Sequence, residues 1–487
     1  MKFNLKVIVN IVGVLLVVNG LLMLTCLPFS FYYNESSWVE ISISSGINII
    51  SGLILYFFSR NKNTNSLKKR DGYLIVTFSW VFLSLFGMLP YILTNQIPSF
   101  TNAFFESVSG YTTTGSTILD DIEGSLDYGL MYWRSLTQFM GGMGIIVLAV
   151  AILPFLGIGG MQLFVAEAPG ISPDKLSPRI ADTAKRLWLI YVSFTVVLFF
   201  LLYAEGMNFF DSVNHAMTTM ATGGFSTKNE SIGFFDDTPI IQYTIIFFMA
   251  LSATNFTLIY FGLKFRFKKI IENEEFRFYI SFLAIITLIV FSTLYYIDNS
   301  DIEKTFRSAL FNVVAIITTT GYASADYTSW NTFMTLLFFI LMFFGATAGS
   351  TSGGVKLIRH IVLLKNIFVE LKKQLHPSAV IPIRFNSNVV SRDIISNILA
   401  FMMLYLVLFS IGTILMSLTG VDFITAVGSA GSAIGNVGPG IGDVGPSETY
   451  SQIPVAGKYI LCALMFLGRL ELFTVLLIFT PFFWTDH

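Results

Sequence analysis

The sequence contains few charged residues and almost no cysteine. Only 12% of its 487 residues are Asp, Glu, Lys or Arg, whereas 54% are apolar and the mean hydropathy is +0.71. A soluble domain carries roughly 25% charged residues, so this composition excludes an ordinary water-soluble protein. The two cysteines, Cys26 and Cys462, lie in apolar runs, which argues against a disulfide framework and favours simple packing.

The sequence instead contains several long apolar runs. About 20 apolar residues in a helix cover the ~30 Å hydrocarbon core of a bilayer, so such runs predict membrane spans. The first run is long for a signal peptide and is followed by Pro28 and aromatic residues rather than by a cleavage site, so it is also expected to span. The expected spans are residues 7–27, 38–59, 72–94, 130–153, 187–206, 239–262, 278–297, 330–344 with a continuation past 354, 393–417 and 453–480.

A short loop rich in hydroxyl groups and glycine occurs four times among these spans. The fourth residue of each loop is a glycine, and a phenylalanine lies 15 residues before it in every copy. The loops read Thr112-Thr113-Thr114-Gly115-Ser116, Ala221-Thr222-Gly223-Gly224-Phe225, Thr318-Thr319-Thr320-Gly321-Tyr322 and Gly435-Asn436-Val437-Gly438-Pro439, and the phenylalanines are Phe100, Phe209, Phe306 and Phe423. Four matches at one spacing identify an internal repeat.

The apolar runs ahead of these loops are too short to cross a membrane. They cover residues 101–111, 209–220, 304–317 and 422–434 and are expected to form re-entrant half-helices, two of them beginning near Asp211 and Asp422. We therefore predict an all-α polytopic membrane protein with four span–half-helix–span repeats around a pseudo-fourfold pore, preceded by a two-span hairpin. The predicted units are the hairpin, residues 1–70, and the four pore repeats, residues 71–165, 166–272, 273–370 and 371–487.

Positive charge is distributed unevenly along the chain. Most of the 29 lysine and arginine residues fall in residues 1–6, 60–70, 154–186, 263–277 and 355–392, all on one side of the expected topology. That side is expected to be cytoplasmic and to hold both termini. The opposite loops carry carboxylates, which either raise the local cation concentration or simply keep the loops polar. These carboxylates are Asp120, Asp121, Glu123, Asp127, Asp236, Asp237, Asp298, Asp301, Glu303, Asp443 and Glu448.

The four loops have the chemistry of a site for a dehydrated cation. Potassium needs several oxygen dipoles in place of its water shell, and backbone carbonyls supply them without trapping the ion. Glycine permits the dihedrals that turn carbonyls towards an axis, and the C-terminal end of each half-helix adds a negative dipole. The candidate filter residues are Thr113, Thr114, Gly115, Thr222, Gly223, Gly224, Thr319, Thr320, Gly321, Asn436, Val437 and Gly438. No loop reads Thr-Val-Gly-Tyr-Gly, so we expect moderate selectivity.

Small residues can also serve close helix packing in a membrane. We prefer that interpretation for Gly141-Gly142-Met143-Gly144. It does not explain loops that interrupt apolar hairpins, because non-helical backbone at membrane depth must line a cavity. Glu106 and His215 lie on the half-helices, where bracing of the helix is a better interpretation than ion binding.

Two features distinguish the second spans of the last two repeats. A run without bulky side chains interrupts the third repeat, which predicts an intramembrane loop that is either a gate or a passive kink; we favour the gate. Its residues are Gly345, Ala346, Thr347, Ala348, Gly349, Ser350, Thr351, Ser352, Gly353 and Gly354. Arg469 falls near the middle of the last expected span, where a charge is costly. It is interpreted as a positive barrier in the conduction path, or alternatively as half of an ion pair with Glu471.

Catalysis is a weak alternative. Ser350, Ser352 and His360 could suggest an intramembrane hydrolase, but no carboxylate is spaced to orient the histidine. A transport function without enzymatic activity is therefore expected. Few ionisable groups fall at mid-membrane, which favours channel-like flow over the alternative of obligatory proton- or sodium-coupled symport.

Together these residues resemble the Trk/Ktr/HKT superfamily of potassium transporters, and within it the TrkH type. The resemblance covers nearly the whole chain and includes the leading hairpin. Beyond the loops it rests on Gly141-Gly142-Met143-Gly144-Ile145-Ile146, His376-Pro377-Ser378-Ala379-Val380 and Gly468-Arg469-Leu470-Glu471.

The resemblance implies a gated potassium pore within one chain, working as a homodimer in the bacterial inner membrane. It places filter glycines at Gly115, Gly224, Gly321 and Gly438, with the register of the second loop fixed only by the match of Phe225 to Tyr322. It also implies a cytosolic ring of TrkA-type subunits that senses ATP, ADP or NAD, which fits the basic segments 263–277 and 355–392. Potassium is then the transported ligand, membrane lipid the surrounding partner, and neither an organic cofactor nor nucleic acid is expected.

Overall fold

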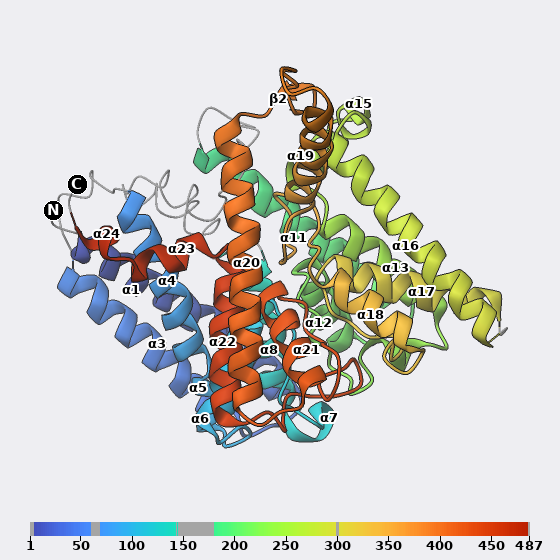
Figure 1. Ribbon diagram of the computed structural model, residues 1–487. Coiled ribbons are helices and arrows are strands. Elements are labelled where there is room, and N and C mark those ends of the chain that lie inside the picture. Colours follow the sequence, from blue (N-terminus) through green and yellow to red (C-terminus); the bar gives the residue numbers. More distant parts are fainter. Residues whose placement is uncertain (1–3, 60–68, 143, 145–179, 299–300, 486–487) are drawn as a thin grey trace.

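The computed structural model describes residues 4–59, 69–142, 144, 180–298 and 301–485. These residues form a bundle of helices, and the β-structure among them is one two-stranded hairpin (Figure 1). The predicted all-helical membrane fold is confirmed. The elements up to the middle of the chain are α1 (Leu5–Met23), η1 (Leu24–Cys26), α2 (Leu27–Tyr32), α3 (Trp38–Ser59), α4 (Lys69–Gly87), α5 (Leu89–Leu93), α6 (Phe100–Tyr111), α7 (Ile122–Ser125), α8 (Tyr128–Gly142), α11 (Ile180–Ala204), α12 (Phe209–Met220), η2 (Ser231–Phe235), α13 (Pro239–Ser252), α14 (Phe256–Leu263) and α15 (Phe267–Ile271).

The remaining elements complete the bundle, and the last of them lies beside the first helix of the chain. They are α16 (Glu274–Asp298), α17 (Ile302–Ile317), α18 (Thr332–Leu341), α19 (Leu357–Leu375), β1 (Arg384–Phe385), β2 (Asn388–Val389), α20 (Arg392–Leu418), α21 (Phe423–Gly435), α22 (Val455–Arg469), α23 (Phe473–Leu476), η3 (Leu477–Phe479) and α24 (Pro481–Trp484). Arg70 donates to the carbonyls of Phe483 and Thr485, each at 3.0 Å, and the Asn4 N–H donates to Asp71. The starts of α1 and α4 therefore lie beside the end of α24, on the same side of the bundle (Figure 1).

Six described helices are long and apolar enough to cross a membrane, and the number rises to eight if each of two bent helix pairs counts as one span. The six are Leu5–Tyr32, Trp38–Ser59, Arg70–Leu93, Ala184–Ala204, Glu274–Ile297 and Arg392–Leu418. Each coincides closely with an expected span. The expected span 130–153 begins in α8, but its second half lies outside the described residues, as do most of the basic segments 60–70 and 154–186 and the expected boundary at residue 165.

The N-terminal hairpin is held together by small residues and buried amides. A Cβ added to Gly13 would lie 2.7 Å from the Gly52 carbonyl oxygen, so α1 and α3 touch backbone to backbone. Asn19 donates to Asn48 at 2.9 Å and accepts a 2.6 Å hydrogen bond from the hydroxyl of Tyr111, the last residue of α6. The hairpin thereby braces the first of the short helices.

The four short helices expected from the sequence are present as α6, α12, α17 and α21. The first three end directly before their loops, and α21 ends at Gly435, the first residue of its loop. Their N-terminal caps are in part different from those expected. Asn208, not Asp211, caps α12 by accepting from the Asp211 N–H, whereas Asp422 caps α21 as expected. An amide and a carboxylate can each accept from an exposed helix N–H, so composition alone does not choose between neighbouring caps.

Two expected spans are broken rather than continuous. The expected span 239–262 bends by 107° between α13 and α14, and the expected span 453–480 bends by 109° between α22 and the segment Phe473–Phe479. The first break is stabilised by Asn255, which caps α14 and also donates to the Ala348 carbonyl. The second contains Glu471 and Leu472, both at positive φ. The length of an apolar run indicates that a segment is buried but not that its helix is continuous. Both breaks were therefore absent from the expected spans.

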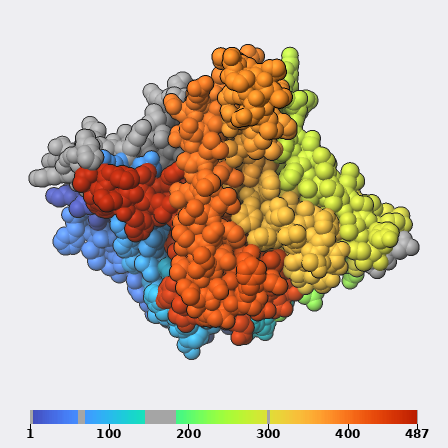
Figure 2. Space-filling view, viewed as in Figure 1, coloured from blue at the N-terminus to red at the C-terminus, as the bar shows by residue number. Residues whose placement is uncertain are grey.

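The third repeat also breaks, as expected. Helix α18 ends at Leu341, and α19 begins only at Leu357. Breaks also occur in the second and fourth repeats, and the one after α18 is the longest of the three among the described residues. Beyond it, the end of α19, the β1–β2 hairpin and the start of α20 project from one end of the molecule (Figures 1 and 2).

Candidate functional site

The four loops after the short helices share one backbone conformation. The second residue of each loop and the glycine two positions later both have positive φ, which glycine adopts freely and a β-branched residue rarely does. The values are Thr113 53° and Gly115 85°, Thr222 52° and Gly224 75°, Thr319 56° and Gly321 74°, and Asn436 52° and Gly438 108°. In the second loop, the residue equivalent to Gly115 and Gly321 is therefore Gly224 rather than Gly223.

The same hydrogen bond closes each of the four helices. The N–H of the third loop residue donates to a carbonyl five residues earlier, which is the bond of a Schellman motif. The donor–acceptor pairs are Thr114–Ser109, Gly223–Thr218 and Thr320–Ala315, each at 2.9 Å, and Val437–Ser432 at 3.0 Å. The loops thus repeat in geometry as well as in sequence.

The four loops close into a ring. A Cβ added to each loop glycine would collide with the carbonyl oxygen of the third residue in the next loop. The distances are 2.3 Å from Gly115 to Gly223, 1.9 Å from Gly224 to Thr320, 1.9 Å from Gly321 to Val437 and 2.8 Å from Gly438 back to Thr114. Each contact is shorter than any that a real Cβ tolerates, so the loops approach one another closely enough to require glycine.

Hydroxyl and amide groups of the loop residues form further hydrogen bonds within this ring. Thr112 pairs with Thr114 at 2.7 Å, and the equivalent pair Thr318–Thr320 lies at 2.8 Å. Asn436 joins the fourth loop to the first through a 3.0 Å hydrogen bond to the Thr114 hydroxyl. The Thr113 hydroxyl and the Asn436 side-chain carbonyl are buried without a hydrogen-bond partner among the described residues.

Gln138 on α8 is a site residue that the sequence analysis missed. Its side-chain amide donates to the Gly223 carbonyl at 2.5 Å and accepts from the Phe225 N–H at 3.0 Å, so it clamps both sides of Gly224. A glutamine in an apolar helix was the available signal, because a buried amide in a membrane needs partners.

Tyrosine hydroxyls brace the ring from outside. The hydroxyl of Tyr322 bonds Thr218 at 2.5 Å, that of Tyr450 donates to the Gly438 carbonyl at 2.9 Å, and that of Tyr327 donates to the Gly440 carbonyl at 2.9 Å. All three rings are fully buried. These bonds fix the loop backbones against the short helices and their neighbours.

Glu106, which was expected to brace its helix rather than bind the ion, braces the residues that follow the first loop. It accepts hydrogen bonds from the hydroxyl of Thr117 and the N–H of Ile118, and it forms a 2.6 Å ion pair with Arg134 of α8. Arg134 also donates to the Ser226 carbonyl and stacks over Phe225 at 3.5 Å. This buried pair joins the first loop to the second, and Arg134, an ionisable residue within an apolar run, is a second residue that the sequence analysis missed.

Replacing Glu106 with glutamine should lower the free energy of unfolding by about 3–5 kcal/mol, because it leaves the buried Arg134 without its counter-charge. Denaturation of the purified protein in detergent measures the effect. Glu123, which is 40% exposed and pairs with Lys228, is the matched control; Glu123→Gln should cost no more than about 1 kcal/mol. Equal, small losses in the two variants would contradict the bracing role.

His215 also braces its helix. Its ring nitrogens contact the Asp211 carbonyl at 2.8 Å and the Ser226 hydroxyl at 2.9 Å, and its side chain is fully buried. These contacts join α12 to the residue that follows the second loop, which agrees with the bracing role expected from the sequence.

An open cavity of about 120 Å³ lies next to the ring. The glycine at the fourth position of every loop lines it. Of the expected outer carboxylates, Asp120 and Glu448 reach it. Others are engaged elsewhere: Asp236 pairs with Lys304 and Arg307, at 2.7 and 2.8 Å. Burial opposes the charged form of Asp236, but the bonds from these two cations outweigh it and lower its pKa. The cavity is thus lined by two of the expected carboxylates, together with Arg134 and Lys228.

The glycine-rich run lies directly against the inner side of the ring. The Gly353 N–H donates to the Thr319 hydroxyl at 2.6 Å, and a Cβ on Gly353 would lie 2.8 Å from the Gly435 carbonyl. The Thr351 hydroxyl donates to the carbonyls of Ser252 and Met220, at 3.1 and 3.2 Å. The segment Gly345–Gly354 therefore contacts the second, third and fourth repeats at once.

Arg469 reaches this segment from the end of α22. It donates to the carbonyls of Thr351 at 2.9 Å, Gly141 at 2.6 Å and Gly142 at 3.1 Å. It ends its helix rather than lying at the middle of a continuous span, because the chain bends there. The alternative pairing with Glu471 is wrong, since Glu471 forms its ion pair with Arg359 of α19.

Ser350 and Ser352, the serines considered for hydrolysis, contact groups other than His360. Ser352 contacts Ser350 at 2.9 Å and Lys356 at 3.1 Å, whereas His360 stacks on Phe344 with ring centroids 4.4 Å apart. The described His, Cys, Asp and Glu residues also contain no cluster of three that could hold a metal ion.

Known proteins are similar to this chain in sequence and in architecture. A family model described as TrkH, cation transport protein, matches residues 40–485. The chain is 39% identical over 484 residues to the Trk system potassium uptake protein TrkH of Halomonas elongata, with 99% of each chain covered. It is also 39% identical over 489 residues to the protein of that name from Escherichia coli K12, covering 99% of this chain and 100% of that one. The crystal structure of the potassium transporter TrkH from Vibrio parahaemolyticus superposes with a TM-score of 0.89 and 34% identity over the full length of both chains. The chain therefore belongs to the TrkH family of cation transport proteins, a transport family rather than an enzyme class.

Proposed function

We propose that this protein takes up potassium across the bacterial inner membrane through a gated, channel-like pore. The observation that carries the proposal is the ring of four loops, in which the third residue of each loop contacts the glycine of its neighbour. A closed ring of backbone carbonyls can replace the water shell of a potassium ion. The four helix C-termini behind it add negative dipole ends, which favour a cation.

The segment Gly345–Gly354 is the proposed gate. It packs against the inner side of the ring and has hydrogen bonds to the second repeat, to Thr319 of its own repeat and to Arg469 of the fourth, so its displacement would open the space below the loops. Arg469 supports it in this position through the Thr351 carbonyl and adds a positive charge that opposes cations. Potassium then flows down its electrochemical gradient when the segment moves.

The cytoplasmic side is proposed to be the one that holds both chain ends, α19 and the β1–β2 hairpin. Lys372 and Arg384 are exposed on this projecting part, which suits docking of a TrkA-type nucleotide-sensing ring. The Arg359–Glu471 ion pair links α19 to the break after α22, so a force on α19 has a direct route to Arg469. We also propose that the protein works as a homodimer and that each chain divides into the units 1–70, 71–165, 166–272, 273–370 and 371–487.

Rubidium-86 uptake into liposomes that contain this chain alone tests the proposal. We expect uptake that follows an imposed potassium gradient, is absent from empty liposomes and exceeds sodium-22 uptake several-fold. Equal uptake of both cations would contradict potassium selectivity, and an absolute requirement for external sodium or a proton gradient would favour the symport alternative. If the chain alone takes up no rubidium, uptake restored by adding the purified TrkA-type subunits would support gating. Absence of uptake with those subunits present would refute the pore.

A further inference from the structure

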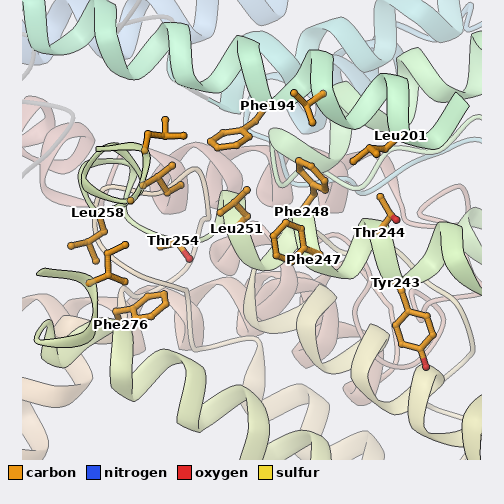
Figure 3. A pocket seen from close by; sticks show the side chains of 15 residues that line it. Phe194, Leu201, Tyr243, Thr244, Phe247, Phe248, Leu251, Thr254, Leu258 and Phe276 are labelled. Atoms are coloured by element: carbon orange, nitrogen blue, oxygen red, sulfur yellow. The ribbon is translucent and has the colours of Figure 1, made fainter. Parts of the chain in front are cut away.

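The bend between α13 and α14 leaves an apolar groove on the surface of the bundle. Helices α11, α13 and α14 and the start of α16 enclose about 710 Å³, within the ~300–1,000 Å³ usual for small-molecule sites (Figure 3). Phe194, Phe247, Leu251, Leu258 and Phe276 point into it (Figure 3).

The hydroxyl groups along the groove are already satisfied within the protein. Thr254 donates to the Ala250 carbonyl at 2.9 Å, Thr244 to Glu205 at 2.6 Å and Tyr243 to Glu303 at 3.0 Å. An occupant therefore gains from apolar contact rather than from hydrogen bonds. This is the chemistry of a hydrocarbon chain.

A basic turn begins where the groove ends. Gly262, Leu263 and Ile270 line the groove, and the segment between them carries four exposed cations: Lys264, Arg266, Lys268 and Lys269. Exposed apolar side chains alternate with these cations, including Phe265, which is 83% exposed, and Phe267 and Ile271. Lysines alternating with aromatic and aliphatic residues are typical of a segment that lies in a membrane surface and attracts anionic lipids.

We infer that this corner binds an anionic phospholipid, with one acyl chain in the groove and the headgroup phosphate on the basic turn. Three carboxylates lie near this site. Glu272 forms an exposed ion pair with Lys268 at 3.7 Å, Glu274 pairs with Lys365, and Glu275 accepts from the Ala348 N–H. The other three cations of the turn form no ion pair among the described residues, so they are available to a phosphate. The exposed aromatic residues of the turn favour a lipid over a cytosolic protein as its occupant.

The groove is connected to the glycine-rich segment through the helix break. Leu251 and Thr254 line the groove, and the neighbouring Ala253 carbonyl accepts from the Thr347 hydroxyl at 2.9 Å. Asn255 donates to the Ala348 carbonyl at 2.7 Å, and the Phe256 N–H donates to Gly349 at 3.0 Å. A lipid in the groove would thus support the bend that holds this segment, a consequence that rests on the proposed gate.

Native mass spectrometry of the full chain in detergent, titrated with phosphatidylglycerol or with phosphatidylcholine of the same acyl chains, tests the binding. We expect saturable binding of phosphatidylglycerol at an at least tenfold lower concentration. Val197→Trp should abolish this binding by filling the groove, as should Leu201→Trp. Val196→Trp is the matched control, because Val196 and Val197 are both 47% exposed on α11 but only Val197 lines the groove. A quadruple change to glutamine at Lys264, Arg266, Lys268 and Lys269 should remove the preference for the anionic lipid.

Equal binding of the two lipids by the native chain would overturn the inference, and so would native binding by folded Val197→Trp and Leu201→Trp proteins. Dissociation of a dimer by both groove variants would instead identify a second copy as the occupant and also overturn it. Rubidium flux in phosphatidylcholine liposomes with and without phosphatidylglycerol tests the link to the gate separately. Equal rubidium flux with and without phosphatidylglycerol, despite selective binding of that lipid, would overturn that link alone.

Discussion

Replacing Gly321 with serine should reduce selective potassium uptake at least about tenfold, which corresponds to about 1.4 kcal/mol in the barrier. A Cβ at this position would lie 1.9 Å from the Val437 carbonyl oxygen and 2.9 Å from the ring of Pro439, and the φ of 74° is itself unfavourable for serine. The third and fourth loops must therefore separate, which widens the ring and weakens its fit to a dehydrated ion. The expected result is lost rubidium uptake or uptake that no longer prefers potassium over sodium.

Gly420→Ser is the matched control for this experiment. Gly420 has a φ of 92°, so serine is strained there too, but nothing lies within 4 Å of an added Cβ. A comparable fall in uptake in both variants would assign the effect to backbone strain and protein yield rather than to the ring. Native uptake and selectivity in folded Gly321→Ser protein would remove Gly321 from the filter.

Removing the Arg469 side chain should raise rubidium uptake by the chain alone, without any partner subunit, by roughly tenfold. Alanine cannot donate to the carbonyls of Thr351, Gly141 and Gly142, so the glycine-rich segment loses a charge-assisted anchor, typically about 1.5–3 kcal/mol per bond to a charged group. The change also removes a positive charge from the proposed ion path. Both effects act in the same direction.

Arg392→Ala controls for the loss of one positive charge, since Arg392 is exposed at the start of α20. Its uptake should equal that of the native chain. Shortening the segment Gly345–Gly354 by two residues should raise uptake as Arg469→Ala does, because the remaining chain cannot fill the space below the ring. Unchanged or reduced uptake in folded Arg469→Ala and shortened proteins would argue against the gate.

Much of the fold follows from local patterns in the sequence. Span positions depend on the length of apolar runs, and six of them agree with the described helices. The short helices and their loops could be located because a glycine at positive φ must follow each helix end, and its spacing from a phenylalanine is fixed. The interruption at Gly345–Gly354 was also evident, because four glycines with serines and threonines among ten residues disfavour a helix.

The tertiary structure alone decided which distant groups meet. The breaks after Ser252 and Arg469 depend on partners supplied by other segments, such as the Ala348 carbonyl that Asn255 binds. The roles of Gln138 and Arg134 likewise require the second loop to lie beside α8. The sequence by itself determined the repeated loops and their glycines, because dihedral and hydrophobic preferences are properties of short segments. It could not determine the contacts that close the ring, the partners of Arg469 or the groove beside α13, because each is a contact between segments that only folding brings together.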